Sequence, residues 1–511
     1  MTRPFVASPA QQTYFDWISH GEGSAVVEAV AGSGKTTTVL QGLSRMQGSI
    51  ALIAYNNKIA KELKERTASM RNVRSGTFHG AGLSALKFAF KGSKLESDEK
   101  KVRRIVDALI EERDRKDLIG IEDTVCAVVS MAKQRGIGAL SSISDDSAWR
   151  QMIEHFSLDD ALPEGQEHMI PQVIAVSKIV LGRSNQDLET IDFDDMVYLP
   201  LQRNIRMFPN DWVIVDEAQD TNPTRRALAR KMLRRGGRLV AVGDPCQAIY
   251  GFTGTDNDSL DQIAREHRAT RLPLSVTYRC PKSVVSVARE WVSHIEAHES
   301  APDGEIVEYG YESILDYVRA GDAVLCRYNK HLVSLVFRLI RAGVPAKIEG
   351  RQIGMGLVKL AGRWKTKTLD ALGKKLESYL ERETAKAAAK ENERRIQDVS
   401  DHVETMFVLI DRAREQKMTT VSELQTMILE VFDDSVVGDA SMVTLCSGHR
   451  SKGLEWERVH ILGLRELTVR THHDWQAQQE TNLLYVMTTR AKQTLHIVSG
   501  LRDETHRRPE L

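Results

Sequence analysis

The chain has 511 residues, of which 41% are hydrophobic and 27% charged, an ordinary globular composition with room for roughly three or four domains. Its 70 lysine and arginine residues balance 70 aspartate and glutamate residues, so a nucleic-acid partner would have to be held by a local basic surface. No apolar stretch approaches the ~20 residues that a membrane span needs, so no membrane partner is expected.

The first predicted element is a helix near the N-terminus. Ser8 is a favourable N-cap residue and Pro9 suits the first helical position, ahead of an amphipathic run over 14–18. The preceding residues lack the apolar core of a signal peptide. The five cysteines are far apart, without a CxxC pair or zinc spacing, which predicts reduced thiols in a cytoplasmic protein.

A phosphate-binding loop follows the first predicted strand, 24–30. The strand ends in a glycine-rich turn and a helix start, where backbone N–H groups and the helix dipole attract an anion. Lys35 would reach the β- and γ-phosphates of a nucleotide, and the Thr36 hydroxyl would ligate Mg²⁺. The strict pattern has glycine at the place of Ala29, so a plain glycine turn before a helix is the alternative. The candidate nucleotide-binding residues here are Ala31, Gly32, Ser33, Gly34, Lys35, Thr36 and Thr37.

Three further segments fill the first half of the chain. Residues 50–55 form an apolar strand that ends before a charged helix, and 75–80 read as a strand end or loop. Residues 84–190 are mainly helical in pattern and carry no recognisable chemistry. Strands are predicted again at 212–215 and 238–242.

Two adjacent carboxylates end the strand at 212–215. Asp216 would hold Mg²⁺, directly or through water, and Glu217 would orient and deprotonate the water that attacks the γ-phosphate. A pair of carboxylates after a strand often does no more than cap a helix. Here the pair is combined with the phosphate loop and extended as D-E-A-Q-D, which makes the motif specific. The basic residues that follow are predicted on one helix, as a solvated face or a DNA contact. They are Arg225, Arg226, Arg230, Lys231, Arg234 and Arg235.

The second half of the chain repeats the alternation of strands and helices. Apolar strands are predicted at 323–326, 442–445, 459–462 and 495–498. Alternating strands and helices favour parallel sheets of the α/β class, which bind ligands at the carboxyl ends of their strands. Residues 365–400 alternate in charge and predict a solvated helix with i,i+4 ion pairs.

Ordered motifs give the chain a family resemblance. Beyond the phosphate loop and D-E-A-Q-D, they are Y-N-N-K at 55–58, T-F-H at 77–79, G-D-P-C-Q-A-I-Y-G-F at 243–252, T-Y-R at 277–279, H-R-S-K-G-L-E-W at 449–456 and L-Y-V-M-T-T-R-A at 484–491. In this order they resemble a UvrD/Rep-like DNA helicase of superfamily 1.

The resemblance implies an α/β fold with two RecA-like parallel-sheet cores of the P-loop NTPase class, each with a helical insertion. The second insertion looks smaller than in UvrD or Rep, and no fused nuclease domain is expected. The implied boundaries are 1–84 and 190–275 for the first core, 85–189 for its insertion, 276–352 and 440–501 for the second core, 353–439 for its small insertion, and 502–511 for a polar tail.

The family's ATP contacts carry over to six residues. Gln11 is expected to hydrogen-bond the adenine edge and Tyr278 to stack on adenine, while Glu455 resembles the residue that holds the ribose. Gln247 is expected to sense the γ-phosphate. Arg279 and Arg490 are expected to act as arginine fingers from the second core, so that ATP with Mg²⁺ is bound between the cores.

The resemblance also implies a set of DNA contacts. Stacking aromatic side chains are expected to grip bases without regard to sequence. For Tyr55 and Phe252, the alternative is packing in the hydrophobic core. The family commonly has an arginine at the position of Thr253, so this chain departs from the pattern there. The candidate DNA-binding residues are Tyr55, Asn57, Phe78, His79, Phe252, His449 and Lys452.

The resemblance therefore predicts an ATP-dependent helicase that moves 3′→5′ on single-stranded DNA and opens tailed duplexes. A translocase that strips proteins from DNA with little unwinding is the first alternative. A regulatory DNA-binding module with a degenerate ATP site is the second, although the expected catalytic residues are all present. A nucleotide kinase or small GTPase is a weaker alternative, since neither needs D-E-A-Q-D or Arg490. Protein partners and the pathway served are not indicated.

Overall fold

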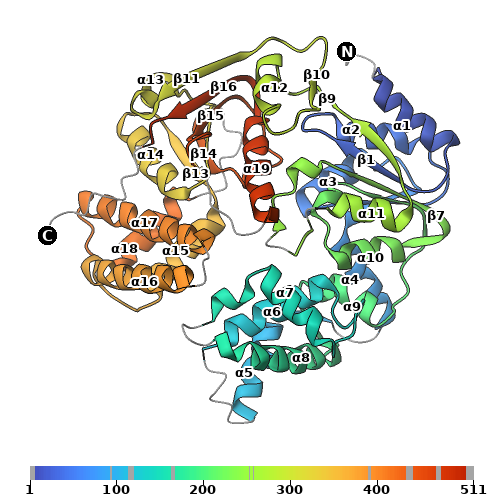
Figure 1. Cartoon of the computed structure of the whole chain (residues 1–511), viewed down its shortest axis with the longest axis horizontal. Coiled ribbons are helices and arrows are strands. Elements are labelled where there is room, and N and C mark those ends of the chain that lie inside the picture. The colour runs from blue at the N-terminus through green and yellow to red at the C-terminus, as the bar shows by residue number, and fades with distance from the viewer. Residues whose placement is uncertain are drawn as a thin grey trace. The chain divides into compact units, whose positions relative to one another are not determined.

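The computed structural model describes residues 6–91, 95–112, 120–162, 167–251, 254–256, 258–389, 393–432, 441–467 and 474–501. The chain divides into two units, shown in Figure 1. The first comprises 1–30 and 34–275, and the second comprises 31–33 and 276–511. Among the described residues, no helix has the length and apolarity to cross a membrane.

The first unit is built on a six-stranded sheet in the order β3-β2-β6-β7-β1-β8, with every neighbouring pair parallel. The central strands are almost wholly apolar and buried, as expected when helices cover both faces of a parallel sheet. The strands are β1 (Ala25–Ala29), β2 (Ile50–Ala54), β3 (Val73–Thr77), β6 (Asn210–Val215), β7 (Leu233–Gly243) and β8 (Thr270–Leu274).

Helices connect these strands. As predicted, Ser8 caps the first helix: its side chain accepts from the backbone N–H of Gln11, whose own side chain accepts from the N–H of Ser8. The helices of this core are α1 (Pro9–His20), α2 (Lys35–Leu43), α3 (Asn57–Arg66), α4 (Phe78–Ala89), α9 (Asp195–Gln202), α10 (Pro223–Lys231) and α11 (Ser259–His267).

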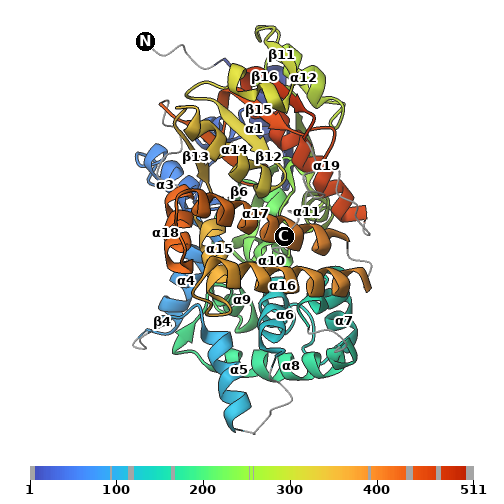
Figure 2. The ribbon, with the colours of Figure 1, turned by 90° about the vertical axis from the view of Figure 1, so that its left-hand side faces the viewer.

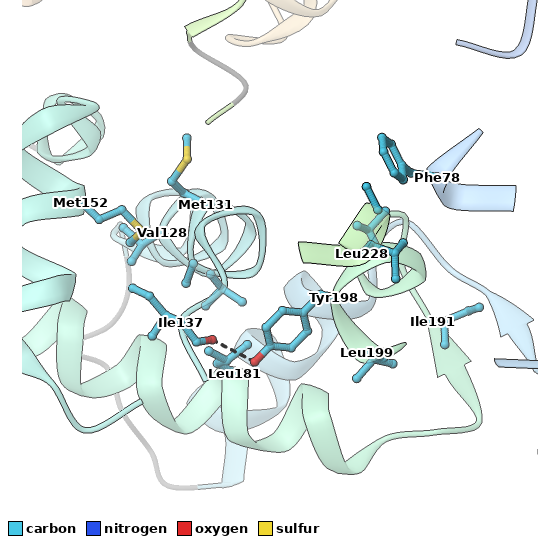
Figure 3. Close-up of a cluster of buried hydrophobic side chains, with 14 of the residues drawn as sticks. Phe78, Val128, Met131, Ile137, Met152, Leu181, Ile191, Tyr198, Leu199 and Leu228 are labelled. Carbon is cyan, nitrogen blue, oxygen red and sulfur yellow. Dashed lines mark hydrogen bonds between the residues drawn. The ribbon is translucent and has the colours of Figure 1, made fainter. Parts of the chain in front are cut away.

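A helical subdomain occupies the chain between α4 and α9. Its apolar side chains join those of the first sheet in one buried cluster, and Figure 3 shows part of it around Tyr198, whose hydroxyl donates to the carbonyl oxygen of Ile137 at 2.9 Å. The subdomain is therefore packed onto the core. Its elements are α5 (Lys101–Glu112), α6 (Glu122–Arg135), α7 (Asp146–His155), α8 (Ile170–Gln186) and the short parallel pair β4 (Glu96–Ser97) and β5 (Thr190–Ile191).

The second unit contains another six-stranded parallel sheet, in the order β11-β16-β15-β12-β14-β13. The strands are β11 (Glu305–Gly310), β12 (Ala323–Cys326), β13 (Ala346–Glu349), β14 (Val443–Ser447), β15 (Trp456–Leu462) and β16 (Ala491–Ser499). A two-stranded pair, β9 (Val276–Thr277) and β10 (Glu296–Ala297), precedes it. Its helices are α12 (Lys282–Ala288), α13 (Ile314–Tyr317), α14 (Asn329–Arg341) and α19 (Asp474–Thr488).

Between β13 and β14, the described residues form four helices that lie beside one another in both views (Figures 1 and 2). They are α15 (Arg351–Gly362), α16 (Leu369–Ala389), α17 (Glu393–Glu415) and α18 (Val421–Val431). The prediction of one solvated helix over 365–400 was wrong. Two helices occupy this stretch, and Leu369, Leu372 and Leu376 are buried in the core of the second unit. Their spacing places an apolar stripe on one face of a charged helix.

The basic run after Asp216 is also divided differently from the prediction. Helix α10 ends at Lys231, and Arg234 and Arg235 belong to β7, which begins at Leu233 and pairs there with Asn210. The first residues of β7 are charged, so the sequence pattern did not indicate that they belong to a strand. Hydrophobic periodicity identifies only the apolar part of β7, 238–242.

A buried cluster of aromatic and titratable side chains lies against one side of the second sheet. The imidazole rings of His460 and His496 stack with centroids 4.0 Å apart. His460 is hydrogen-bonded on both sides, to the Tyr309 hydroxyl at 2.6 Å and to the Asp322 carboxylate at 2.9 Å. His496 is 3% exposed, and neither of its ring nitrogens has a hydrogen-bond partner. Burial, followed by the neighbouring His460 and Arg458, lowers the pKa of His496 to about 3.

We expect this cluster to make the second unit sensitive to acid. An unfolded histidine has a pKa near ~6.5, so between that pH and about 3 the unfolded chain binds a proton that folded His496 does not. The stability contributed by neutral His496 is thus complete above about pH 6.5 and is lost as the pH falls. At pH 5.5 the loss amounts to about 1 kcal/mol, or roughly 2–4 °C in melting midpoint.

The variant His496→Phe keeps an aromatic ring in the stack but cannot titrate. Its melting midpoint should fall less than that of the unmodified protein between pH 7.5 and pH 5.5, as measured by calorimetry. Equal falls in both proteins would show that His496 does not contribute to the acid sensitivity.

Candidate functional site

The phosphate loop joins the end of β1 to the start of α2. Gly32 and Gly34 have φ values of +72° and +77°, in the left-handed region that glycine adopts without strain. Gly34 is the N-cap of α2, and its carbonyl oxygen accepts from both the backbone N–H and the hydroxyl of Thr38. The Ser33 hydroxyl is buried without a hydrogen-bond partner. A loop with two left-handed glycines and an unpaired buried hydroxyl at the start of a helix fits a bound phosphate chain.

Four predicted catalytic side chains of the first unit gather where β1 and β6 end. The Lys35 ammonium lies 3.4 Å from the Glu217 carboxylate, and the Thr36 hydroxyl donates to Asp216 Oδ2 at 3.4 Å. Asp216 is the first residue after β6, and its Oδ1 accepts from the backbone N–H of Glu217 at 3.0 Å. Glu217 itself has a φ of 53°, a left-handed conformation that is uncommon outside glycine. The parallel sheet thus brings residues about 180 positions apart together.

Electrostatics in this cluster favour a cation or a proton. Burial, followed by the charge of Glu217, raises the pKa of Asp216 to about 6, although Lys35 opposes the shift. Burial also raises the pKa of Asp244. The pKa of Lys35 is raised, because the carboxylates of Glu217, Asp244 and Asp216 together outweigh its burial. Closely spaced, poorly solvated carboxylates around one ammonium are typical of a site that binds metal and phosphate.

Two residues without an assigned role in the sequence analysis connect the catalytic groups. The Gln219 amide nitrogen donates to Glu217 Oε2 at 2.5 Å, and its oxygen accepts from the backbone N–H of Asp244 at 3.1 Å. The Asp244 carboxylate in turn accepts from the Gln247 side chain at 2.7 Å. Gln247, the predicted γ-phosphate sensor, is thereby linked to Glu217 through Asp244 and Gln219. Gln219 and Asp244 belong to the motifs D-E-A-Q-D and G-D-P-C-Q, but the hydrogen bonds that connect the two motifs become visible only in the fold.

Gln11 is 4% exposed and hydrogen-bonded at both ends of its amide. Its oxygen accepts from the backbone N–H of Ser8 at 3.0 Å, and its nitrogen donates to the Thr38 hydroxyl at 2.9 Å. The predicted adenine contact is therefore held next to the helix that follows the phosphate loop. A primary amide retains one N–H and one oxygen lone pair for a further partner.

The oxygen atoms of Thr36 and Asp216 fit a magnesium ion. Hydroxyl and carboxylate oxygens are ligands that Mg²⁺ prefers, and it commonly takes one or two of them together with phosphate oxygens and water. In the part of the chain that the structure describes, no group of three or more histidine, cysteine, aspartate or glutamate side chains could hold a metal by itself. A metal shared between protein and nucleotide is consistent with this.

An aromatic surface adjoins the catalytic carboxylates in the first unit. The Tyr55 ring stacks on Tyr250 with an interplanar angle of 3° and a centroid distance of 5.8 Å, and the guanidinium of Arg225 lies 5.4 Å from the Tyr55 ring centre. The residues that line a small cavity there include Tyr55, His79 and Arg225 together with Asp216 and Glu217. Groups suited to contact bases therefore lie beside groups suited to hydrolysis.

The other predicted DNA contacts of the first unit differ in exposure. Asn57 is exposed at the start of α3. His79 stacks on the half-exposed ring of Phe193, with centroids 3.7 Å apart. Phe78 is 5% exposed and belongs to the hydrophobic core, and it also lines the small cavity beside Tyr55, so its DNA contact stays a prediction. Phe252 and the neighbouring Thr253 lie outside the described residues.

The remaining predicted ATP contacts belong to the second unit. The Arg279 Nε donates to Glu455 Oε2 at 2.7 Å, so these two predicted ATP-binding side chains are hydrogen-bonded to each other. Arg490 is 1% exposed, and its guanidinium donates to the carbonyl oxygens of Val486 and Leu454. Tyr278 is 46% exposed, and its backbone N–H donates to the carbonyl oxygen of Gly32 at 2.9 Å.

His449 and Lys452, the predicted DNA contacts of the second unit, are both partly exposed between β14 and β15. Their role as DNA contacts stays a prediction.

Comparison with known proteins agrees with this geometry. Residues 10–268 match the UvrD/REP helicase N-terminal domain, and residues 359–501 match the UvrD-like helicase C-terminal domain. Among curated proteins, the ATP-dependent DNA helicase PcrA of Staphylococcus epidermidis is 23% identical over 378 residues, which cover 65% of this chain and 49% of that protein. The PcrA protein of Leuconostoc citreum is 24% identical over 323 residues, covering 58% of this chain and 41% of that protein.

The PcrA protein of Staphylococcus aureus is 22% identical over 622 aligned positions, covering 96% of this chain and 83% of that protein. In the Staphylococcus epidermidis alignment, by contrast, the chain spans about half of the relative's length. The family models match more than half of the sequence, and the matched ranges include the phosphate loop, Asp216, Glu217 and the motif around Arg490. By these matches, the chain belongs to the UvrD/REP helicase family.

Proposed function

We propose that this protein is an ATP-dependent DNA helicase that translocates 3′→5′ on single-stranded DNA and unwinds duplex DNA. The observation that carries the proposal is the cluster of Lys35, Thr36, Asp216 and Glu217 at the ends of β1 and β6. These side chains supply a phosphate-binding cation, two ligands for Mg²⁺ and a base for the attacking water. Magnesium, when bound with ATP, would neutralise charge on the phosphates.

The proposed domain organisation follows the family pattern. One RecA-like core comprises 1–84 and 190–275 with a helical insertion at 85–189, and the other comprises 276–352 and 440–501 with an insertion at 353–439. Each core is supported by a parallel six-stranded sheet. Residues of the two cores act on one ATP, so that its binding and hydrolysis favour different arrangements of the cores and ratchet single-stranded DNA.

A second candidate function is translocation with displacement of bound proteins and little duplex unwinding. The compact second insertion, which consists of α15 to α18 in the described residues, favours it. The substrates in this case are single-stranded DNA and DNA-bound proteins rather than tailed duplexes.

One series of assays tests both functions. ATP hydrolysis is measured with and without single-stranded DNA, and unwinding is then measured on duplexes with a 3′ or a 5′ single-stranded tail. The helicase proposal expects DNA-stimulated hydrolysis and opening of 3′-tailed duplexes. Opening of only the 5′-tailed duplex would refute the polarity, and stimulated hydrolysis with protein displacement but no unwinding would favour the second candidate.

The aromatic surface gives a separate prediction. Tyr55→Ala should weaken single-strand binding by about 1–3 kcal/mol, the usual contribution of one base stacked on one ring. Nucleotide affinity should be preserved, since Tyr55 is not among the phosphate-loop residues. Fluorescence anisotropy with a labelled oligothymidine and titration with a fluorescent ATP analogue measure the two affinities. Tyr55→Phe serves as the matched control and should bind DNA like the unmodified protein; weakened nucleotide binding with normal DNA binding would assign Tyr55 to the core.

A further inference from the structure

A groove of about 690 Å³ separates α10 from the helical subdomain of the first unit. Its walls include the apolar side chains of Leu140, Leu201, Pro223 and Ala227. Leu140 is 48% exposed, yet the turn that carries it is fixed, because its backbone N–H donates to the carbonyl oxygen of Gly136 at 2.7 Å. A preorganised leucine at the mouth of a groove offers a contact for an apolar side chain of a ligand.

The basic residues of α10 give the groove a positive charge. Arg230 is exposed, and the ammonium of Lys231 donates to a neutral partner, the Asn204 side chain, at 2.5 Å. Burial lowers the pKa of nearby His267, and the charge of Arg230 lowers it further. Among the described residues that line the groove, Glu266 is the one carboxylate, and it lies 3.8 Å from Arg226 Nε. The groove is therefore complementary to an anionic ligand.

Arg226 supplies an unpaired donor inside the groove wall. It is 6% exposed, and its terminal nitrogens donate to Asp256, Gln262 and the carbonyl oxygen of Thr221. Its Nε–H has no hydrogen-bond partner, because Glu266 at 3.8 Å is too distant. This nitrogen is buried out of reach of a ligand, so the cations left to meet a ligand's charge are Arg230 and Lys231.

We propose that this groove binds an acidic peptide segment of a partner protein, with an apolar residue between carboxylates. The cations Arg230 and Lys231 meet the carboxylates, while Leu140, Leu201 and Ala227 receive the apolar side chain. A peptide is favoured over single-stranded nucleic acid because the described lining residues include no aromatic ring for base stacking. The groove is distinct from the phosphate loop and from the surface around Tyr55.

Binding is tested on the full chain with a panel of fluorescein-labelled ten-residue peptides made of glutamate and leucine in varied order. Matched peptides with glutamine in place of glutamate and a ten-nucleotide oligothymidine are the comparison probes. We expect at least one acidic peptide to bind ten-fold or more tightly than its glutamine counterpart, and added salt to weaken it.

Three variants locate the binding. Arg230→Glu and Leu140→Asp, both at exposed positions, should each weaken the acidic peptide at least ten-fold, while Arg235→Glu, an exposed arginine outside the groove, should change it less than two-fold. Absence of any charge-dependent peptide, or equal effects of Arg230→Glu and Arg235→Glu, would overturn the proposal. Loss of oligothymidine binding in Arg230→Glu with peptide binding unchanged would also overturn it and assign the groove to nucleic acid.

Discussion

Replacing Glu217 with glutamine is expected to lower DNA-stimulated ATP turnover by about 10²–10⁴-fold, the usual contribution of a general base. The glutamine keeps the size of the side chain and can still accept from the Gln219 amide, but it cannot remove a proton from water. Lys35 and Thr36 are unchanged, so nucleotide affinity should change little. Steady-state hydrolysis with single-stranded DNA and titration with a fluorescent ATP analogue measure the two effects separately.

Two further variants make this result specific. Glu62→Gln removes a carboxylate that is 62% exposed on α3 and should leave turnover unchanged. Lys35→Ala should also abolish turnover, but with weaker nucleotide binding, since Lys35 is expected to contact the phosphates in the ground state. Wild-type turnover in Glu217→Gln would show that another group activates the water.

Apolar runs predicted the eight inner strands of the two sheets, whereas of the four outer strands only the end of β3 was indicated, as a strand end or loop at 75–80. Strands β1, β2, β6 and β7, and likewise β12, β14, β15 and β16, have buried apolar stretches that the sequence displays as continuous runs. The outer strands β3, β8, β11 and β13 lie at the edges of the sheets. Their sequences, such as V-R-S-G-T in β3, mix polar and apolar residues because an edge strand is partly exposed.

The sequence predicted those parts of the candidate site whose geometry depends only on residues that are adjacent in the chain. The phosphate loop and the pair Asp216–Glu217 each follow a strand directly, so their positions depend on local structure alone. The connection from Glu217 to Gln247 was not predictable, because Gln219 and Asp244 bridge two separate strand ends. The pairing of Arg279 with Glu455 joins residues 176 positions apart and also needs the fold.

Removal of the Arg279 guanidinium is expected to lower turnover by about 10³-fold or more, in the range found for arginine fingers. A guanidinium stabilises charge that develops on the phosphate oxygens during transfer, so the loss should fall on kcat rather than on KM. Arg279→Lys should recover little of the activity, because an ammonium lacks the planar donors of the guanidinium. Steady-state ATP hydrolysis with saturating single-stranded DNA measures both parameters.

The ion pair with Glu455 offers a competing explanation, namely that Arg279 only positions this carboxylate. Arg279 Nε and Glu455 Oε2 are 2.7 Å apart, and Lys492 also approaches Glu455, at 3.9 Å. Glu455→Gln breaks the ion pair while leaving the guanidinium in place. If Arg279 stabilises the transition state and Glu455 holds the ribose, Glu455→Gln should raise KM for ATP and leave kcat within a few-fold. An equal loss of kcat in Glu455→Gln and Arg279→Ala would mean that the pair acts as one structural unit, and Arg279 would then not be a finger.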